Sequence, residues 1–109
     1  MYQGTTPSVI FEIKGMDLST ATVYVSFKRG QDVLTKSDVT VTYDDVEEIS
    51  TIVCPLTQEE TLAIRAGTVI AQIRFIYSDG QAYATDKAEI NVDSVIYPEV
   101  IEYNGGDDT

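Results

Sequence analysis

Hydrophobic and polar residues alternate along most of this chain, a period of two that is typical of β-strands with one buried and one solvated face. In the first such segment Val9, Phe11 and Ile13 share one parity, while Glu12 and Lys14 have the other. Similar patterns, weakest in the second of them, predict strands near residues 22–28, 33–35, 39–43 and 48–56. Turn-forming residues bound each segment, so antiparallel strands are expected.

The alternation is interrupted once, after Leu56. Thr57-Gln58-Glu59-Glu60 has the form of a capping box, in which the threonine hydroxyl and the Glu60 carboxylate each accept a hydrogen bond from the other residue's amide. Leu62-Ala63-Ile64 would give this turn an apolar face, and Gly67 would end it in the left-handed conformation. The sequence therefore predicts one short helical turn near residues 57–66.

A long two-stranded ribbon follows, with Asp79-Gly80 as a strong signal for a two-residue turn. This turn would place Phe75 opposite Ala84 on the inner face and Ile76 opposite Tyr83 on the outer face. Residues expected to point inward are Val69, Ala71, Ile73, Phe75, Tyr77, Ala82, Ala84, Ala88, Ile90 and Val92.

These elements predict an all-β fold, an antiparallel β-sandwich of about seven or eight strands with immunoglobulin-like or Greek-key topology. Any likeness to immunoglobulin domains would be one of topology only, because the chain has no Trp and a single Cys. Asp86 has inward parity in the last strand, which predicts a bend or bulge there. The expected organisation is an extended N-terminal arm at 1–7, the sandwich at 8–96 and an acidic, flexible C-terminal tail at 97–109.

The formal net charge is −11, from 18 acidic and 7 basic residues. This balance argues against binding to nucleic acid or to an anionic membrane, since both rely on clustered Lys and Arg. It favours solubility, and it leaves a nucleic-acid mimic as a less favoured alternative because the acids are not gathered in one long run. No segment approaches the roughly 20 apolar residues that span a bilayer, and residues 1–7 lack the features of a secretory signal.

No residue pattern predicts catalysis or a small-molecule substrate. The chain has no histidine, which removes the commonest general base and metal ligand. Cys54 lies on the apolar parity of its strand, so we expect a buried thiol. Asp44, Asp45, Glu47 and Glu48 read as a solvated turn, because their spacing does not fit a calcium loop. We therefore expect no enzymatic activity, no cofactor and no metal.

Several large apolar residues fall where a solvated surface would prefer polar groups. On the outward parity of strands they indicate a subunit interface, a face covered by a terminal arm, or a platform for sugar stacking. In the C-terminal tail they indicate either a frayed end or an arm that orders on a partner. The candidate interface residues are Tyr24, Ile70, Ile76, Tyr83, Tyr97, Ile101 and Tyr103.

Three stretches carry a family resemblance: Met1-Tyr2-Gln3-Gly4-Thr5-Thr6-Pro7, then Leu56-Thr57-Gln58-Glu59-Glu60-Thr61-Leu62 with Gly67, and Ser78-Asp79-Gly80. With them the chain resembles small structural proteins of the tail or baseplate region in tailed phages and prophages of Gram-positive bacteria. It is also distantly similar to the N-terminal domain of baseplate upper proteins. These motifs are turn and capping signals, and they carry no catalytic residues to transfer.

The resemblance implies a virion or virion-assembly component that works through protein–protein contacts. Its partners would be other phage structural proteins or further copies of itself in a homo-oligomer. It would be found in the bacterial host cytoplasm during assembly, and in the virion if it stays in the particle. A carbohydrate-binding or adhesion module, with Tyr24 and Tyr83 stacking on a sugar, is the alternative from another class.

Overall fold

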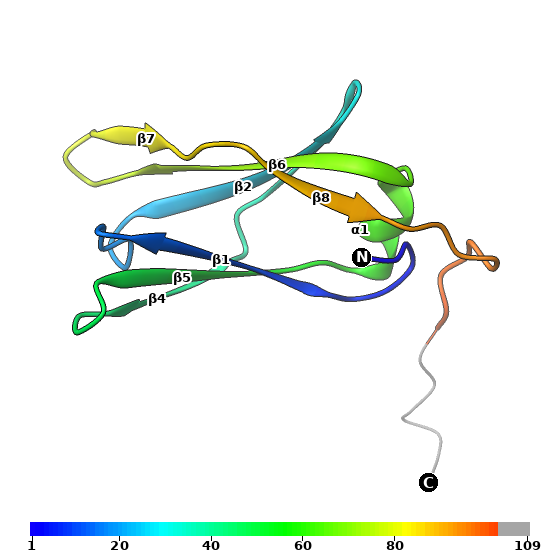
Figure 1. Ribbon diagram of the computed structural model, residues 1–109, viewed down its shortest axis with the longest axis horizontal. Helices are drawn as coiled ribbons and strands as arrows, with labels where there is room; N and C mark the ends of the chain where they lie inside the picture. Colours follow the sequence, from blue (N-terminus) through cyan, green and yellow to red (C-terminus); the bar gives the residue numbers. More distant parts are fainter. Residues whose placement is uncertain (103–109) are drawn as a thin grey trace, which may run out of the picture.

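The computed structural model describes residues 1–102, which form two antiparallel sheets packed face to face with one short helix at an end (Figure 1). The smaller sheet has the order β1-β5-β4, and the larger has the order β3-β2-β6, with β7 and β8 both paired to β6. The predicted all-β sandwich with one helical turn is therefore confirmed. The elements are β1 (Ser8–Lys14), β2 (Thr22–Arg29), β3 (Asp32–Lys36), β4 (Thr40–Asp44), β5 (Ile49–Pro55), α1 (Gln58–Ala63), β6 (Gly67–Ile76), β7 (Ala82–Ala84) and β8 (Ala88–Val92).

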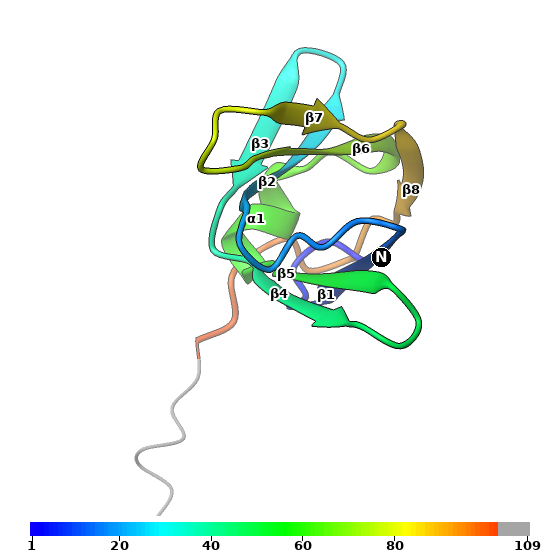
Figure 2. The ribbon, with the colours of Figure 1, turned by 90° about the vertical axis from the view of Figure 1, so that its left-hand side faces the viewer.

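The strand order is that of an immunoglobulin-like Greek key. Strands β1, β5 and β4 occupy the places of strands B, E and D in that fold, and β3, β2, β6 and β8 occupy those of C′, C, F and G. The chain changes sheets between β1 and β2, between β3 and β4, and between β5 and β6, where α1 lies across one end of the sandwich (Figure 2). The likeness is thus topological, as expected for a chain with one Cys and no Trp.

The core lies between the two sheets and consists of the inward parities that alternation predicts. Val25 and Phe27 on β2 face Ile73 and Ala71 on β6 as cross-strand partners, and all four are buried. Cys54 on β5 is completely buried, as predicted. The buried apolar residues are Leu18, Val23, Val25, Phe27, Ile52, Cys54, Leu56, Ile64, Val69, Ala71, Ile73, Phe75 and Val92.

The loop from β1 to β2 is attached to the core through Ser50, a buried hydroxyl on β5. Ser50 Oγ accepts a hydrogen bond from the Leu18 amide at 2.9 Å and donates one to the Met16 carbonyl at 2.6 Å. Both capacities of the hydroxyl are satisfied, so burying it carries little desolvation cost. These two bonds hold the β1–β2 loop so that the buried Leu18 side chain closes the end of the sandwich opposite α1.

The capping box at the start of α1 is confirmed, but the predicted end of the helix is wrong. The Glu60 amide donates to Thr57 Oγ1 at 3.1 Å, and the Thr57 amide donates to Glu60 Oε1 at 2.8 Å. The helix ends at Ala63 with Ile64 in extended conformation, so no left-handed glycine terminates it.

Gly67 instead begins β6, with φ of 127°. The guanidinium of Arg29 packs directly on it, and a Cβ at this position would lie 2.9 Å from Arg29 Cζ. The backbone angle therefore favours glycine, and a Cβ here would in addition displace the flexible end of the Arg29 side chain. The buried Arg29 Nε has no hydrogen-bond partner among the described residues.

The hairpin between β6 and β7 has a three-residue loop, so the predicted register is wrong by one residue. The Tyr77 amide donates to the Gln81 carbonyl at 3.0 Å, and the Gly80 amide donates to the Tyr77 carbonyl at 2.9 Å. Gly80 takes the left-handed conformation at φ of 89°, as in a type I turn followed by a bulge. Phe75 consequently pairs with Tyr83.

The same shift reverses the faces of β7. Ala82 and Ala84, expected to point inward, pair with Ile76 and Arg74 and lie on the outer face. Tyr83, expected on the outer face, shares the inner face with Phe75.

A bulge between β7 and β8 restores the predicted parity. The Thr85 amide donates to the Ile73 carbonyl at 2.9 Å, and Thr85 Oγ1 accepts from the Ile73 amide at 3.1 Å. Beyond this point Ala88 pairs with Ala71, one residue out of step with the β7 pairing. The bend predicted near Asp86 is therefore confirmed, and Ile90 and Val92 face inward as expected.

Residues 1–7 pack against the helical end of the sandwich, with a turn at Gln3 and Gly4. The Gln3 side chain donates to the Ile64 carbonyl at 2.7 Å, and Thr61 Oγ1 donates to the Thr5 carbonyl at 2.8 Å. Tyr2 forms a parallel bridge with Asp93, just beyond β8. The segment thus joins the last strand to α1.

A partly buried ion pair fixes α1 to the larger sheet. Lys36, at the end of β3, is only 6% exposed, and its Nζ lies 2.7 and 2.8 Å from the two carboxylate oxygens of Glu60. Burial alone would raise the pKa of Glu60, but the hydrogen bonds from Lys36 and Thr57 outweigh it and hold this pKa below its ordinary value. Burial would likewise lower the pKa of Lys36, and the bonds and charges of Glu60 and Asp38 raise it instead.

The depressed pKa of Glu60 makes its contribution to stability dependent on pH. The carboxylate stabilises the folded chain above the unfolded value near 4.5, and this stabilisation is lost as the pH falls through the lower folded value. We expect Glu60→Gln to reduce the free energy of unfolding by about 1–3 kcal/mol at pH 7. The difference from wild type should narrow below about pH 4.5, as the unfolded carboxyl begins to protonate.

Urea denaturation across this pH range measures both effects. Glu59→Gln is the matched control, because Glu59 is the exposed neighbour on the same turn and should change the stability by less than about 0.5 kcal/mol. A difference between wild type and Glu60→Gln that stays constant with pH would contradict the prediction.

Candidate functional site

Cys54, the single thiol of the chain, is enclosed in the core. Burial raises the pKa of the Cys54 thiol to about 11, so it remains protonated and enclosed at neutral pH. Within residues 1–102, no group of three or more His, Cys, Asp or Glu side chains could hold a metal ion. No helix in that range is long and apolar enough to cross a membrane.

The outer face of the five-stranded sheet carries three of the predicted interface residues. Tyr24 on β2 and Ile76 on β6 are 42% and 41% exposed. Together with Arg74, the cross-strand partner of Tyr24, and Ala82 on β7, they line a shallow groove of about 510 Å³. The β2–β6 pairing therefore brings Tyr24 and Ile76 together on one surface.

Ile70, the third of these residues, lies toward the α1 end of the same face. It is half-buried and lines a second hollow of about 450 Å³, whose other lining side chains include Lys28, Lys87 and Glu89. Gln72 and Arg74 stand between Ile70 and Ile76 on the same side of β6, so the two isoleucines belong to separate hollows.

Tyr83 does not belong to this outer face, which corrects the predicted Ile76–Tyr83 pair. Its ring stacks on Phe75 with centroids 5.4 Å apart, and it meets Tyr77 edge to face at 6.0 Å. The three rings form an aromatic cluster on the inner side of the sheet edge. Tyr24 and Tyr83 consequently point to opposite faces of the sheet and cannot form one platform for a sugar ring.

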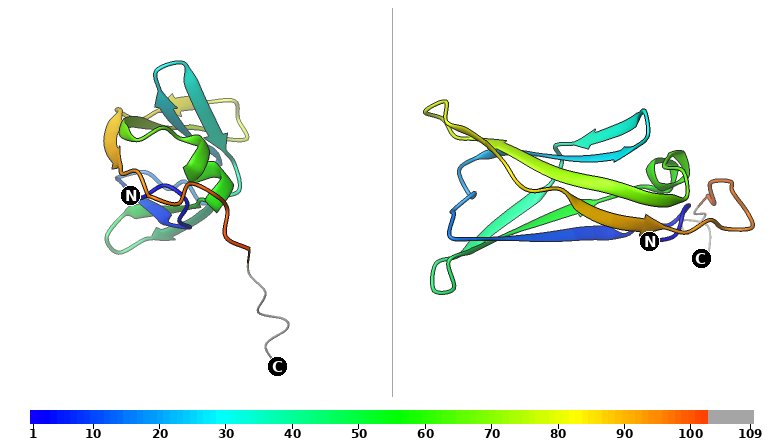
Figure 3. Two further views of the ribbon diagram at one scale, coloured as in Figure 1. Left: turned by 90° about the vertical axis from the view of Figure 1, so that its right-hand side faces the viewer. Right: turned by 45° about the horizontal axis from the view of Figure 1, so that its top comes forward.

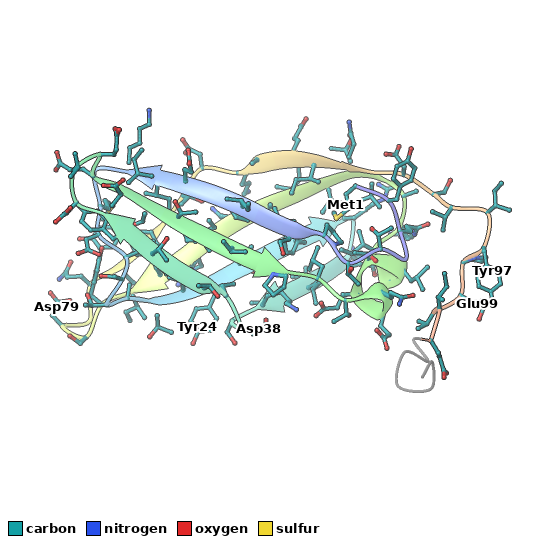
Figure 4. The ribbon with its side chains drawn as sticks, turned by 90° about the horizontal axis from the view of Figure 1, so that it is seen from below. Met1, Tyr24, Asp38, Asp79, Tyr97 and Glu99 are labelled. Carbon is teal, nitrogen blue, oxygen red and sulfur yellow. The ribbon has the colours of Figure 1, made fainter. Side chains whose placement is uncertain are left out.

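The segment after β8 presents the remaining candidates. We call residues 93–102 the terminal segment; it crosses the α1 end of the sandwich and turns down past the smaller sheet (Figure 3). Tyr97 and Ile101 are both 63% exposed, and Tyr97 projects from that end (Figure 4). Ile96 is fully exposed and Val100 partly so. Tyr103, the last predicted interface residue, lies outside the described residues.

Gln58 on α1 fixes the path of the terminal segment. Its Oε1 accepts from the Ile101 amide at 2.7 Å, and its Nε2 donates to the Ile101 carbonyl at 2.8 Å. The side-chain amide thus acts like a backbone partner in a short ladder. Sequence reasoning assigned Gln58 only to the capping motif, because nothing local connects it to a residue 43 positions later.

The outer face also holds a set of cations that the sequence analysis missed. Lys28, Arg74 and Lys87 are all exposed on it, in a chain whose net charge is −11. The outward parity of Lys28 and Arg74 was visible in the sequence. The placement of Lys28 beside Ile70 and of Arg74 beside Tyr24 depends on the pairing of β2 with β6, which parity alone does not specify.

Comparison with known proteins adds no identification to this geometry. No protein-family model matches the chain, and no curated protein sequence matches it significantly.

The aromatic cluster gives a direct test of the register. Tyr83 and Tyr24 are equally exposed, at 42%, so truncating either side chain removes a comparable buried area. Only Tyr83 contacts two other rings, and such contacts contribute beyond area burial. Tyr83→Ala should therefore lower the free energy of unfolding by about 1–2 kcal/mol more than Tyr24→Ala. Equal losses in urea denaturation would favour the alternative register, with Tyr83 on the outer face.

The Gln58 contact predicts a local effect on the terminal segment. Gln58→Ala removes both hydrogen bonds to Ile101, so hydrogen exchange of that amide should accelerate roughly tenfold. Exchange in β2 and β6 should not change. Gln31→Ala, at an exposed glutamine in the β2–β3 turn, is the control and should leave the segment as in wild type. Unaltered exchange in Gln58→Ala would show that other contacts hold the segment.

Proposed function

We propose that this chain is a non-enzymatic structural or assembly protein of the tail or baseplate region of a tailed phage or prophage, and that it acts through protein–protein contacts. The observation that carries the proposal is the terminal segment, which presents a run of large apolar side chains to solvent while Gln58 fixes its backbone. Scattered exposed apolar residues are ordinary, but a run of them on one positioned segment favours an interface.

The position of the segment favours binding for an entropic reason. A fully flexible arm would lose conformational freedom on docking, and that loss opposes association. Two hydrogen bonds to Gln58 already restrict the backbone at Ile101, so part of the ordering cost is met by the fold. Tyr97 adds a large side chain with few rotatable bonds, a type enriched at interface hot spots.

The phage setting is supported by the resemblance of the N-terminal, capping and turn motifs described above. A sandwich held by packing and hydrogen bonds, with its single thiol buried, also suits assembly inside a bacterium. The carbohydrate-binding alternative loses its main structural argument, since Tyr24 and Tyr83 lie on opposite faces of the sheet.

The test uses the phage or prophage that encodes the chain. Mass spectrometry of purified particles and of assembly intermediates should detect the protein, and deletion of its gene should reduce infectious particles by at least about tenfold. Expression of wild type in trans should restore them. Tyr97→Ser with Ile101→Ser should restore them poorly, because the apolar contact surface is removed.

Val46→Ser is the matched control, since Val46 is an exposed apolar residue in the β4–β5 turn, away from the terminal segment. It should restore particles as wild type does. Absence of the protein from particles and intermediates, together with normal yield after deletion, would overturn the proposed function.

A further inference from the structure

Basic side chains are prominent on the outer face of the five-stranded sheet. The chain has only 7 basic residues, yet Lys28, Arg74 and Lys87 are gathered on the outer face of the five-stranded sheet. None of the three makes an ion pair within residues 1–102, whereas Lys36 and Arg65 are paired. Glu89 is the one acid among the described side chains that line either hollow of this face.

These cations surround apolar side chains. Ile70 lies between Lys28, its cross-strand partner on β2, and Glu89, its partner on β8, and Lys87 lines the same hollow. The groove at the other end of the face combines Arg74 with Tyr24 and Ile76. A complementary partner would therefore carry apolar side chains flanked by carboxylates.

The terminal segment has that composition. Its exposed apolar residues are Ile96, Tyr97, Val100 and Ile101. Glu99 and Glu102 lie among and beside them, and residues 93–102 contain no Lys or Arg. Glu99 projects from the same end of the molecule as Tyr97 (Figure 4).

The segment does not reach the outer face of its own chain in this fold. The five-stranded sheet is the upper layer in Figure 1, and its outer face points up, whereas the terminal segment leaves the α1 end and turns down past the smaller sheet. The bonds from Gln58 to Ile101 hold it on that course. A contact between the two surfaces is therefore made between different molecules.

We propose that the terminal segment of one copy docks on the outer face of the five-stranded sheet of a second copy. Glu99 and Glu102 would meet Lys28 and Lys87, and the apolar side chains of the segment would cover Ile70. Each copy carries both surfaces, so the contact is heterologous and repeats from copy to copy as a ring or a filament. The proposal rests on the proposed function and names one partner for it.

Net charge does not prevent this contact. Copies that each carry −11 repel one another at a distance, but salt screens charges beyond about 8 Å at physiological ionic strength. The interaction at contact is set by the nearest side chains, which here have opposite sign. Exposed ion pairs contribute little each, so the association should be weak and should appear at high protein concentration.

Sedimentation velocity of the full chain tests the proposal, at about 100 µM, where contacts of micromolar affinity are populated. The face variant carries Lys28→Glu and Lys87→Glu, and the segment variant carries Glu99→Lys and Glu102→Lys. Wild type should form dimers and larger species, whereas each variant alone should be monomeric. An equimolar mixture of the two variants should associate, because one supplies an unaltered segment and the other an unaltered face.

The control variant, Lys14→Glu, adds negative charge on the smaller sheet, away from the outer face of the five-stranded sheet, and it should associate as wild type does. Circular dichroism confirms that each variant is folded. Monomeric wild type, self-association of either variant, or a mixture that stays monomeric would each overturn the proposal. A monomer that is nevertheless found in particles would overturn only this inference. Self-association of a protein absent from particles and intermediates would count against the proposed function alone.

Discussion

The antiparallel pairing of β2 with β6 is the constraint on which the rest of this structure depends. One ladder assigns Phe27 and Ala71 to the core and, on the opposite side, sets Lys28 beside Ile70 and Tyr24 beside Arg74. Because side chains alternate along both strands, the core and the outer surface cannot be changed independently. A slip of one residue would bury cations and expose the core, so the requirement to bury apolar side chains also determines which charges gather outside.

The helical end of the sandwich shows how one polar contact leads to another. Lys36 is held by Glu60, and Glu60 also completes the cap of α1. The orientation of α1 in turn directs Gln58 toward the terminal segment. A helix this short would not persist in water by itself, so its position comes from the ion pair, the cap and the packing of Ile64. The course of an exposed segment is thus set by a lysine buried at the end of β3.

Local sequence patterns correctly predicted the features that depend on residues close together in the chain. Alternation identified the inward faces of β1, β2, β5, β6 and β8, and the capping box identified the start of α1, because both depend on residues close in sequence. The predicted face of Tyr83 was wrong because the turn has three residues rather than two. The extra residue reverses the direction of every side chain up to the next bulge. Gly67 was assigned to the helix end because glycine commonly ends helices, whereas here its φ of 127° is used at the start of β6. The cations of the outer face were missed because their grouping depends on which strands pair, and those strands are distant in sequence.

Net charge and local charge therefore govern the behaviour of this molecule at different distances. A value of −11 describes its behaviour at distances longer than the screening length, where it opposes association with polyanions and favours solubility. At contact distance the outer face of the five-stranded sheet is basic and apolar, and the terminal segment is acidic and apolar. Complementary surfaces on chains of like net charge associate weakly in solution. Association strengthens when many copies are held together, because their proximity raises the effective concentration. Under the proposed contact, such a balance would keep free copies apart and would let contacts form where a larger assembly gathers them.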